Sequence, residues 1–355
     1  MIIHIIPGSR AERKGERMTK NPMPAPGRVV AIRNEMALLP ATDQQAGIAA
    51  RLDQYVRDAQ GTFAQNTHKA LLADQRVFTA WCEAAGEQPL PASPQTVARF
   101  VDEMAEVKKP ATVRRYVSSI AHQHRAAELD NPAISNVVRL ALKRMGNQKG
   151  RDQQQAEGLT RTLVDRMLNA AGLKLGDLRD RALLAVAYDT LARRSELVAL
   201  AVEDFRREAD GSGSVIIRRS KTDQEGEGMA RYLAPDTVRT LEEWLRASSI
   251  GAGPIFRAAH LGGRLGKPLH PNEVSVRFKA MAQRAGLPLG TVGRISAHST
   301  RIGSAQDQAA AQGISDTAIM QSGGWKTPQM VARYTMRQAT RRSGAARLAE
   351  TQNRV

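Results

Sequence analysis

The chain has 355 residues, a formal net charge of +17 and 42% hydrophobic residues. This length predicts two domains, the apolar content excludes a disordered chain, and the basic excess points to a nucleic acid as partner. A single cysteine excludes a disulfide framework and a multi-cysteine zinc site. No segment reaches the ~20 consecutive apolar residues that a membrane span needs. An aromatic content of 4% disfavours binding of single-stranded nucleic acid by base stacking.

Residues 1–60 combine scattered prolines and charges without a sustained hydrophobic period, which predicts a poorly ordered N-terminal tail. Met18 is an alternative to Met1 as the start of the protein. The apolar opening at residues 1–6 is too short for a signal peptide, and its basic residues follow it instead of preceding it. We therefore expect a cytoplasmic protein of bacterial or viral origin.

A helical period begins near Thr67 and predicts a helical bundle, of four to five helices, over residues 61–147. The expected helix starts are capping residues or residues followed by proline: Thr67, Ser93-Pro94, Thr112 and Asn131-Pro132.

Nine basic and two acidic side chains lie between residues 108 and 149. A solvated surface of mixed charge would balance the two signs more evenly, so we expect this segment to contact the backbone of duplex DNA. The residues expected to bind DNA are Lys108, Lys109, Arg114, Arg115, Arg139, Lys143 and Arg144.

A polar segment rich in glycine and glutamine predicts a linker over residues 148–158, followed by a second domain over residues 159–355. Thr160 is the expected N-cap of the first helix of this domain, and a strongly apolar helix is expected over residues 178–192.

The hydrophobic period then changes. Two strand-like segments, at residues 215–219 and 230–233, flank a polar glycine-rich turn and predict a β-hairpin. Helices are expected from Thr237 to the end of the chain, interrupted by an irregular stretch at residues 257–271. The predicted fold class is therefore mainly α, of α+β type, with a small antiparallel sheet in the second domain.

Four separated segments of the second domain carry polar residues suited to one phosphate. Arg193, Lys221, His298 and Arg301 can bind it jointly, because guanidinium groups contact phosphate oxygens bidentately and the lysine and histidine supply charge and a proton. A tyrosine beside such a cluster, here Tyr334, can attack the phosphorus and hold it covalently.

In their order and context these segments resemble the tyrosine recombinases of the phage integrase family, over about residues 62–350. Arg193 matches the first arginine of the family, and Glu196 matches the acid three residues later. Lys221 matches the hairpin lysine, and His298 and Arg301 match the H-x-x-R pair. Trp325 occupies the aromatic position that follows, and Tyr334 matches the nucleophile. Trp325 stands where most members carry histidine. The segment from Thr190 to Arg193 lacks the glycine usual before that arginine, and residues 1–60 find no clear counterpart.

The resemblance implies a site-specific recombinase that cleaves and rejoins duplex DNA at inverted-repeat sites without a metal ion, ATP or another cofactor. Tyr334 would form a 3′-phosphotyrosyl intermediate, Arg193 and Arg301 would neutralise the phosphate oxygens, and Lys221 would protonate the leaving 5′ oxygen. His298 would transfer a proton near Tyr334, and Trp325 would pack against the site. Glu196 would support His298 or one of the arginines.

The resemblance also implies a C-shaped clamp of two domains on DNA, two protomers on each site and a synaptic tetramer joined by a C-terminal oligomerisation helix. A protein of this kind is expected to act at the bacterial nucleoid and to derive from a phage or plasmid. No membrane or small-molecule partner is implied.

Two other interpretations of the sequence stay open. One is a catalytically silent DNA-binding or replicon protein on the same scaffold. The presence together of six residues disfavours it: Arg193, Lys221, His298, Arg301, Trp325 and Tyr334. The other is a telomere resolvase or a type IB topoisomerase, which the length and context disfavour.

Overall fold

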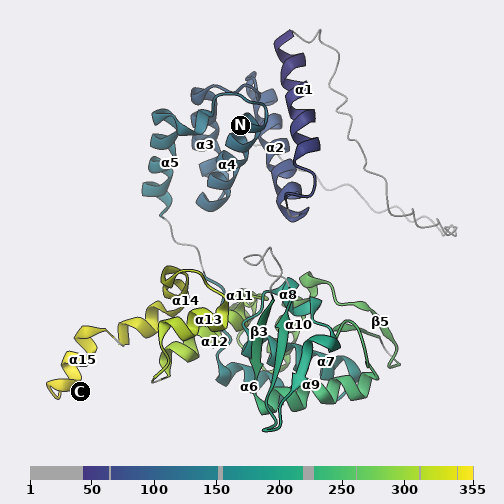
Figure 1. Cartoon of the computed structure of the whole chain (residues 1–355). Coiled ribbons are helices and arrows are strands. Elements are labelled where there is room, and N and C mark those ends of the chain that lie inside the picture. The colour runs from purple at the N-terminus through teal and green to yellow at the C-terminus, as the bar shows by residue number, and fades with distance from the viewer. Residues whose placement is uncertain are drawn as a thin grey trace, which may run out of the picture. The chain divides into compact units, whose positions relative to one another are not determined.

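The computed structural model describes residues 43–63, 65–150, 155–218, 228–260, 262–311, 313–341 and 343–354. The chain divides into two compact units, residues 1–152 and 153–355, and each is described here by itself (Figure 1). Both are mainly helical, and small antiparallel sheets occur in the second, which confirms the predicted fold class. None of the helices in the described ranges is long and apolar enough to cross a membrane.

The described residues of the first unit form helices. In chain order they are α1 (Asp43–Asp58), α2 (Gln65–Ala85), α3 (Pro94–Val107), α4 (Pro110–Ala126), the 3-10 helix η1 (Pro132–Ile134) and α5 (Asn136–Lys149).

The sequence predicts a poorly ordered tail through residue 60. This prediction is wrong for Asp43–Asp58, which form helix α1. Ile48 on this helix is buried, and the ring of Tyr55 meets His122 of α4 edge-on, with 5.6 Å between centroids. A short helix is marginal by itself and takes most of its stability from tertiary packing. The hydrophobic pattern of residues 43–58 is weak. Contacts with α4 supply the stabilisation that this pattern does not provide.

The predicted helix starts of this unit are partly right. Ser93 caps α3, since its Oγ accepts a hydrogen bond from the Thr96 amide at 3.0 Å. Asn131-Pro132 opens only a 3-10 turn, and α5 begins after Ser135, which caps it. Helix α4 begins at Pro110, before the expected Thr112, because proline suits the first turn of a helix.

Aromatic side chains hold α2, α3 and α4 together. Phe100 of α3 lies 5.0 Å from Phe78 and 5.2 Å from Trp81, measured between ring centroids, and both contacts are edge-on. Cys82 is fully buried in the same core, and α5 packs against α3. This packing turns the basic faces of α4 and α5 outward.

The second unit contains helices and two sheets. Its helices are α6 (Arg161–Asn169), α7 (Leu175–Thr190), α8 (Arg194–Ala199), η2 (Val202–Asp204), α9 (Pro235–Ser248), α10 (Pro271–Arg284), α11 (Leu289–Arg294), α12 (Ser299–Ala310), α13 (Asp316–Gly323), α14 (Pro328–Arg341) and α15 (Gly344–Thr351). Its strands are β1 (Phe205–Arg207), β2 (Gly213–Ile217), β3 (Met229–Leu233), β4 (Arg257–Ala259) and β5 (Leu265–Pro268).

Helix α7 lies at the centre of this unit, against α9 on one side and α12 on another. Thr160 precedes α6 as predicted, but its side chain does not cap the helix. Asp307 of α12 does so instead, since its carboxylate accepts hydrogen bonds from the Arg161 amide at 2.6 Å and from the Tyr188 hydroxyl at 2.5 Å. One carboxylate therefore joins α6, α7 and α12.

The predicted hairpin is present as β2 and β3, paired antiparallel with Ile217 opposite Met229. The sequence pattern does not indicate β1, which adds a third strand beside β2. The stretch at residues 257–271, expected to be irregular, contains β4 and β5. Gly262 and Gly263 lie between these strands, and both are in the left-handed region that glycine favours.

A small second core forms where α12, α13 and α14 meet the end of α7. It contains Leu191, Ala305, Ile319, Trp325 and Val331, and Tyr334 packs against it. This core brings residues more than a hundred positions apart in the chain to one place.

Candidate active site

Tyr334 lies on α14 and is partly buried. Its hydroxyl is 2.9 Å from Nε2 of His298, the residue that precedes α12. The two rings lie 5.3 Å apart between centroids. Packing of α14 on α12 creates this pair from positions 36 residues apart.

The imidazole of His298 is neutral at neutral pH. Burial, and then the positive charges of Arg301 and Arg193, lower its pKa to about 4. A neutral imidazole has one ring nitrogen free to accept a proton. A neutral His298 is therefore placed to accept the proton of the Tyr334 hydroxyl.

Arg301 is almost fully buried, at 2% exposure. Its guanidinium donates hydrogen bonds to the carbonyls of Leu191 and Gly323, and its charged end lies 4.5 Å from the ring centre of Trp325. Burial lowers its pKa to about 10, so it stays charged at neutral pH. These contacts fix a buried cation in one orientation before any ligand arrives.

Leu191 occupies the left-handed region, with φ of 50°, although it is not a glycine. This backbone costs an ordinary residue on the order of 1 kcal/mol or more. Its side chain is fully buried in the small core, which holds the conformation in place. The absence of a glycine before Arg193 therefore does not prevent the turn that presents the Leu191 carbonyl to Arg301.

Glu196 supports Arg193. One carboxylate oxygen accepts from the Arg193 side chain at 2.7 Å, and the other accepts from the Arg193 amide at 2.8 Å. Glu196 is buried, whereas Arg193 is only partly so. The carboxylate thus positions an arginine, which is one of the two roles left open by the sequence.

Trp325 is both a core residue and a wall of the site. It is 5% exposed, and its ring lies 5.3 Å from that of Tyr334 at 31°. Gly323 permits this packing, since a Cβ there would lie 2.2 Å from the indole ring.

Arg231 on β3 belongs to the same cluster and was missed by the sequence analysis. Its guanidinium donates to the Gln321 carbonyl at 2.5 Å, and its charge acts on Arg193, Arg301 and Glu196. The sequence feature that could have identified Arg231 is the alternation of side chains between the two faces of a strand. Residues i and i+2 share a face, which places Arg231 on the side of the buried Leu233.

The structure thus brings together six of the residues that the sequence singled out and Arg231. Lys221, expected at the hairpin tip, lies outside the described residues. Among the residues that are described, no group of three or more histidine, cysteine or acidic side chains is arranged to hold a metal ion.

The other tyrosines have different surroundings. Tyr116 is buried in the first unit, Tyr188 donates to Asp307, and Tyr232 is 62% exposed on β3. Tyr55 contacts His122 in the first unit. Among these tyrosines, Tyr334 is the one that meets the arginine and histidine cluster.

The basic residues singled out in the first unit are all exposed: Lys108, Lys109, Arg114, Arg115, Arg139, Lys143 and Arg144. They differ in their partners. Arg115 forms an ion pair with the buried Asp74, and Arg144 contacts Asp102 at 2.6 Å. Arg114, Arg139 and Lys143 line a shared hollow of about 280 Å³ between α4 and α5.

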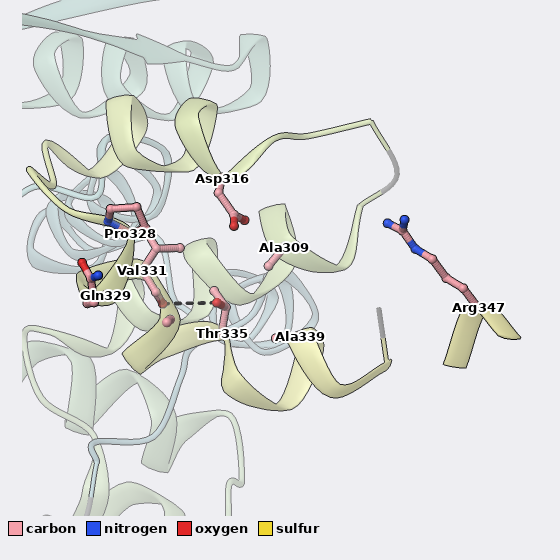
Figure 2. A pocket seen from close by; sticks show the side chains of 9 residues that line it. Ala309, Asp316, Pro328, Gln329, Val331, Thr335, Ala339 and Arg347 are labelled. Carbon is pink, nitrogen blue, oxygen red and sulfur yellow. Dashed lines mark hydrogen bonds between the residues drawn. The ribbon is translucent and has the colours of Figure 1, made fainter. Parts of the chain in front are cut away.

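A groove of about 430 Å³ lies on the second unit, where α12, α13 and α14 meet (Figure 2). Its lining is mostly small or apolar: Ala309, Asp316, Pro328, Gln329, Val331, Ala332, Thr335, Ala339 and Arg347. The Thr335 hydroxyl turns back to the Val331 carbonyl at 3.2 Å. Helix α15, which follows, extends away from the other helices of the unit and buries none of its residues (Figure 1).

The sequence is similar to those of known recombinases. The chain is 34% identical over 285 residues to an integrase/recombinase XerD homolog of Selenomonas ruminantium, covering 76% of this chain and 81% of that protein. It is 28% identical over 324 residues to the recombinase Cre of Escherichia phage P1, covering 86% and 94%.

Among solved structures, a lambda integrase tetramer bound to a Holliday junction shares the fold, with a TM-score of 0.55 at 18% identity. The match covers 81% of this chain and 77% of that one. The model of the phage integrase family matches residues 157–341, which include every described residue of the cluster around Tyr334. The chain therefore belongs to the phage integrase family, that of the tyrosine site-specific recombinases.

Proposed function

We propose that this protein cleaves and rejoins duplex DNA at inverted-repeat sites, with Tyr334 as the nucleophile. The observation that carries the proposal is the 2.9 Å contact between the Tyr334 hydroxyl and a neutral His298, beside the buried cation of Arg301. A phenol next to a proton acceptor and a fixed guanidinium is suited to attack on a phosphodiester.

In the proposed step, the Tyr334 Oη forms a bond to the scissile phosphorus while the bond from phosphorus to the 5′ oxygen breaks. The phenol proton passes to Nε2 of His298. Lys221 gives a proton to the leaving 5′ oxygen. The products are a 3′-phosphotyrosyl ester and a free 5′-hydroxyl, and the reverse reaction with another 5′-hydroxyl rejoins the strand.

The charge of the cluster supports this chemistry. Arg193 and Arg301 share the carboxylate of Glu196, which leaves a surplus of positive charge. A phosphodiester carries one negative charge, and its five-coordinate transition state carries two. A fixed surplus of positive charge therefore stabilises the transition state more than the ground state.

The reaction requires no metal ion, ATP or other cofactor in this scheme. The phosphotyrosyl ester retains the energy of the cleaved bond, so rejoining needs no external source. Trp325 excludes water from one side of Tyr334 and offers its indole N–H to the site.

A nicked suicide substrate tests the nucleophile, because loss of a short strand after cleavage traps the covalent adduct. Tyr334→Phe is expected to bind this DNA normally and to form no adduct. Tyr232→Phe is the matched control, since this exposed tyrosine on β3 lies outside the cluster, and it should form adduct at the wild-type level. Adduct formation by Tyr334→Phe at the wild-type level would refute the assignment.

We assign residues 61–147, within the first unit, to DNA binding and residues 159–355 to catalysis, with a linker at 148–158 between them. The lopsided basic charge on α4 and α5 supports contact with phosphates on both sides of the hollow between them. Relatives of similar fold are described as a dimer on a core site and as a tetramer on a Holliday junction. We propose the same states here, two protomers on each site and four in synapsis.

Helix α15 supports assembly. It carries Leu348, which is 54% exposed, yet none of its residues is buried in its own chain. We assign it to the groove beside α14 of a second copy, whose small side chains leave room for a helix.

A chain ending at Arg341 should bind single sites normally and fail to form synaptic complexes in native gels. Leu348→Ala should weaken the same complexes, and intact synapsis in both variants would contradict this assignment.

We place the protein at the bacterial nucleoid in the cytoplasm, as the product of a phage or plasmid-type element. Its named relatives come from a bacterium and from a bacteriophage, which supports this location.

A further inference from the structure

Arg231 is a charged residue on the inner face of a strand, and its contacts explain why it is there. Its guanidinium does not pair with the nearby carboxylate of Glu196 in the structure. It donates instead to the Gln321 carbonyl at 2.5 Å, at the C-terminal end of α13. Its Nε is buried without a hydrogen-bond partner.

The same guanidinium lies against Gly324, the residue after α13. Gly324 is in the left-handed region with φ of 60°, and a Cβ built on it would lie 2.8 Å from the Arg231 side chain. The turn from Gln321 to Trp325 is therefore in contact with Arg231 at two points.

Arg301 holds the same turn from its other side, through the Gly323 carbonyl. Two arginines from different elements, β3 and α12, thus bind successive parts of one short turn. The turn ends at Trp325, whose ring contacts both Arg301 and Tyr334. A shift of this turn would move a wall of the active site and one anchor of the buried cation.

We propose that Arg231 is a positioning residue that fixes the turn from Gln321 to Trp325 and so orients Trp325 and Arg301 around Tyr334. The proposal rests on the proposed function and adds to it a residue outside the family motif described above. Arg231 acts through the turn and not by touching DNA, because one guanidinium nitrogen donates to the Gln321 carbonyl and another lies against Gly324.

Arg231→Ala should lower the single-turnover rate of adduct formation by about tenfold, because it removes a charged hydrogen bond from a partly buried side chain that holds the turn. DNA affinity and the dependence of binding on salt should stay as in the wild type. Arg231→Lys retains one donor and should recover part of the rate. A wild-type rate for Arg231→Ala, or a reduced salt slope, would overturn the proposal.

Gly324→Ala tests the turn independently, because its Cβ would displace the guanidinium. If Arg231 acts through this turn, the double variant should be no slower than the slower single variant. Gly313→Ala is the matched control for backbone strain, since Gly313 is also left-handed, with φ of 80°, but has open space around its Cβ. Fully additive losses in the double variant would contradict the coupling.

Fluorine NMR of protein labelled with 5-fluorotryptophan gives a readout besides activity. The chain has three tryptophans, so three signals are expected, and Trp325→Phe assigns the relevant one. Arg231→Ala should shift the Trp325 signal and leave that of Trp81 in the first unit unchanged. An unmoved Trp325 signal would refute the proposal even if the variant were slow.

Failure of the proposed function looks different. In that case the wild type would form no adduct, or Tyr334→Phe would still form one. If both behave as expected and Arg231→Ala matches the wild type, only the role of Arg231 is wrong.

Discussion

Arginine serves two opposite purposes in the two units of this protein. On the first unit, Arg114, Arg139 and Arg144 are exposed on helical faces. In the second unit, Arg301 is 2% exposed and donates to backbone carbonyls, and Arg231 and Arg193 are partly buried around it. The same side chain is therefore solvated in one unit and fixed in the other.

The two environments suit the two sets to different tasks. Exposed arginines attract DNA phosphates through charge, and salt weakens that attraction. Buried arginines with fixed hydrogen bonds are already oriented, so they do not reorganise when charge develops on a reacting phosphate. We therefore expect the first set to govern affinity and the second to govern rate.

Substitution in the buried set should have the greatest consequence, and it should fall on the rate. Arg301→Gln should lower the single-turnover rate of cleavage at saturating DNA by about 10²- to 10³-fold, as for removal of one preorganised donor elsewhere. Arg114→Gln, on the exposed set, is the control and should leave that rate unchanged. A reduction below tenfold for Arg301→Gln would remove the distinction between the two sets.

Substitution in the exposed set should have a weaker effect, on affinity. Combining Arg114→Gln with Arg139→Gln should weaken binding and flatten its salt dependence, by about 0.9 in slope for each phosphate that the protein no longer neutralises. Arg115→Gln should behave differently, because it leaves the buried Asp74 without its ion pair and should lower the melting temperature. An unchanged salt slope in the double variant would mean that this face only meets solvent.

A still weaker effect is expected on the dependence of stability on pH. The pKa of His298 is about 4 in the folded protein, below its ordinary 6.5. Between these two pH values the imidazole is protonated in the unfolded chain and neutral in the folded chain. Folding stability should thus decrease as pH falls from 6.5 towards 4, by on the order of 2 kcal/mol after allowance for solvent.

His298→Asn should remove this decrease at acid pH in urea unfolding at pH 7 and pH 4.5. His68→Asn, at an exposed position on α2, controls for the removal of a histidine. Equal acid sensitivity in the wild type and in His298→Asn would show that the imidazole is not shielded.

Local signals in the sequence predicted much of the fold. Ser93-Pro94 marks a helix start because a capping hydroxyl and a proline act within one turn, and the hairpin follows from a change of period. The same signals failed where distant contacts decide. Helix α1 depends on packing against α4. The N-terminus of α6 is capped by Asp307 from another helix and not by the side chain of Thr160.

The sequence by itself indicates which residues would bind a phosphate and which tyrosine would attack it, because residue type, order and spacing are enough to predict such a site. How these residues act depends on the packed structure. Packing brought Arg301 to the Leu191 carbonyl and Arg231 to the turn before Trp325. These contacts join residues whose side chains meet only after helices and strands pack, and no local pattern records them.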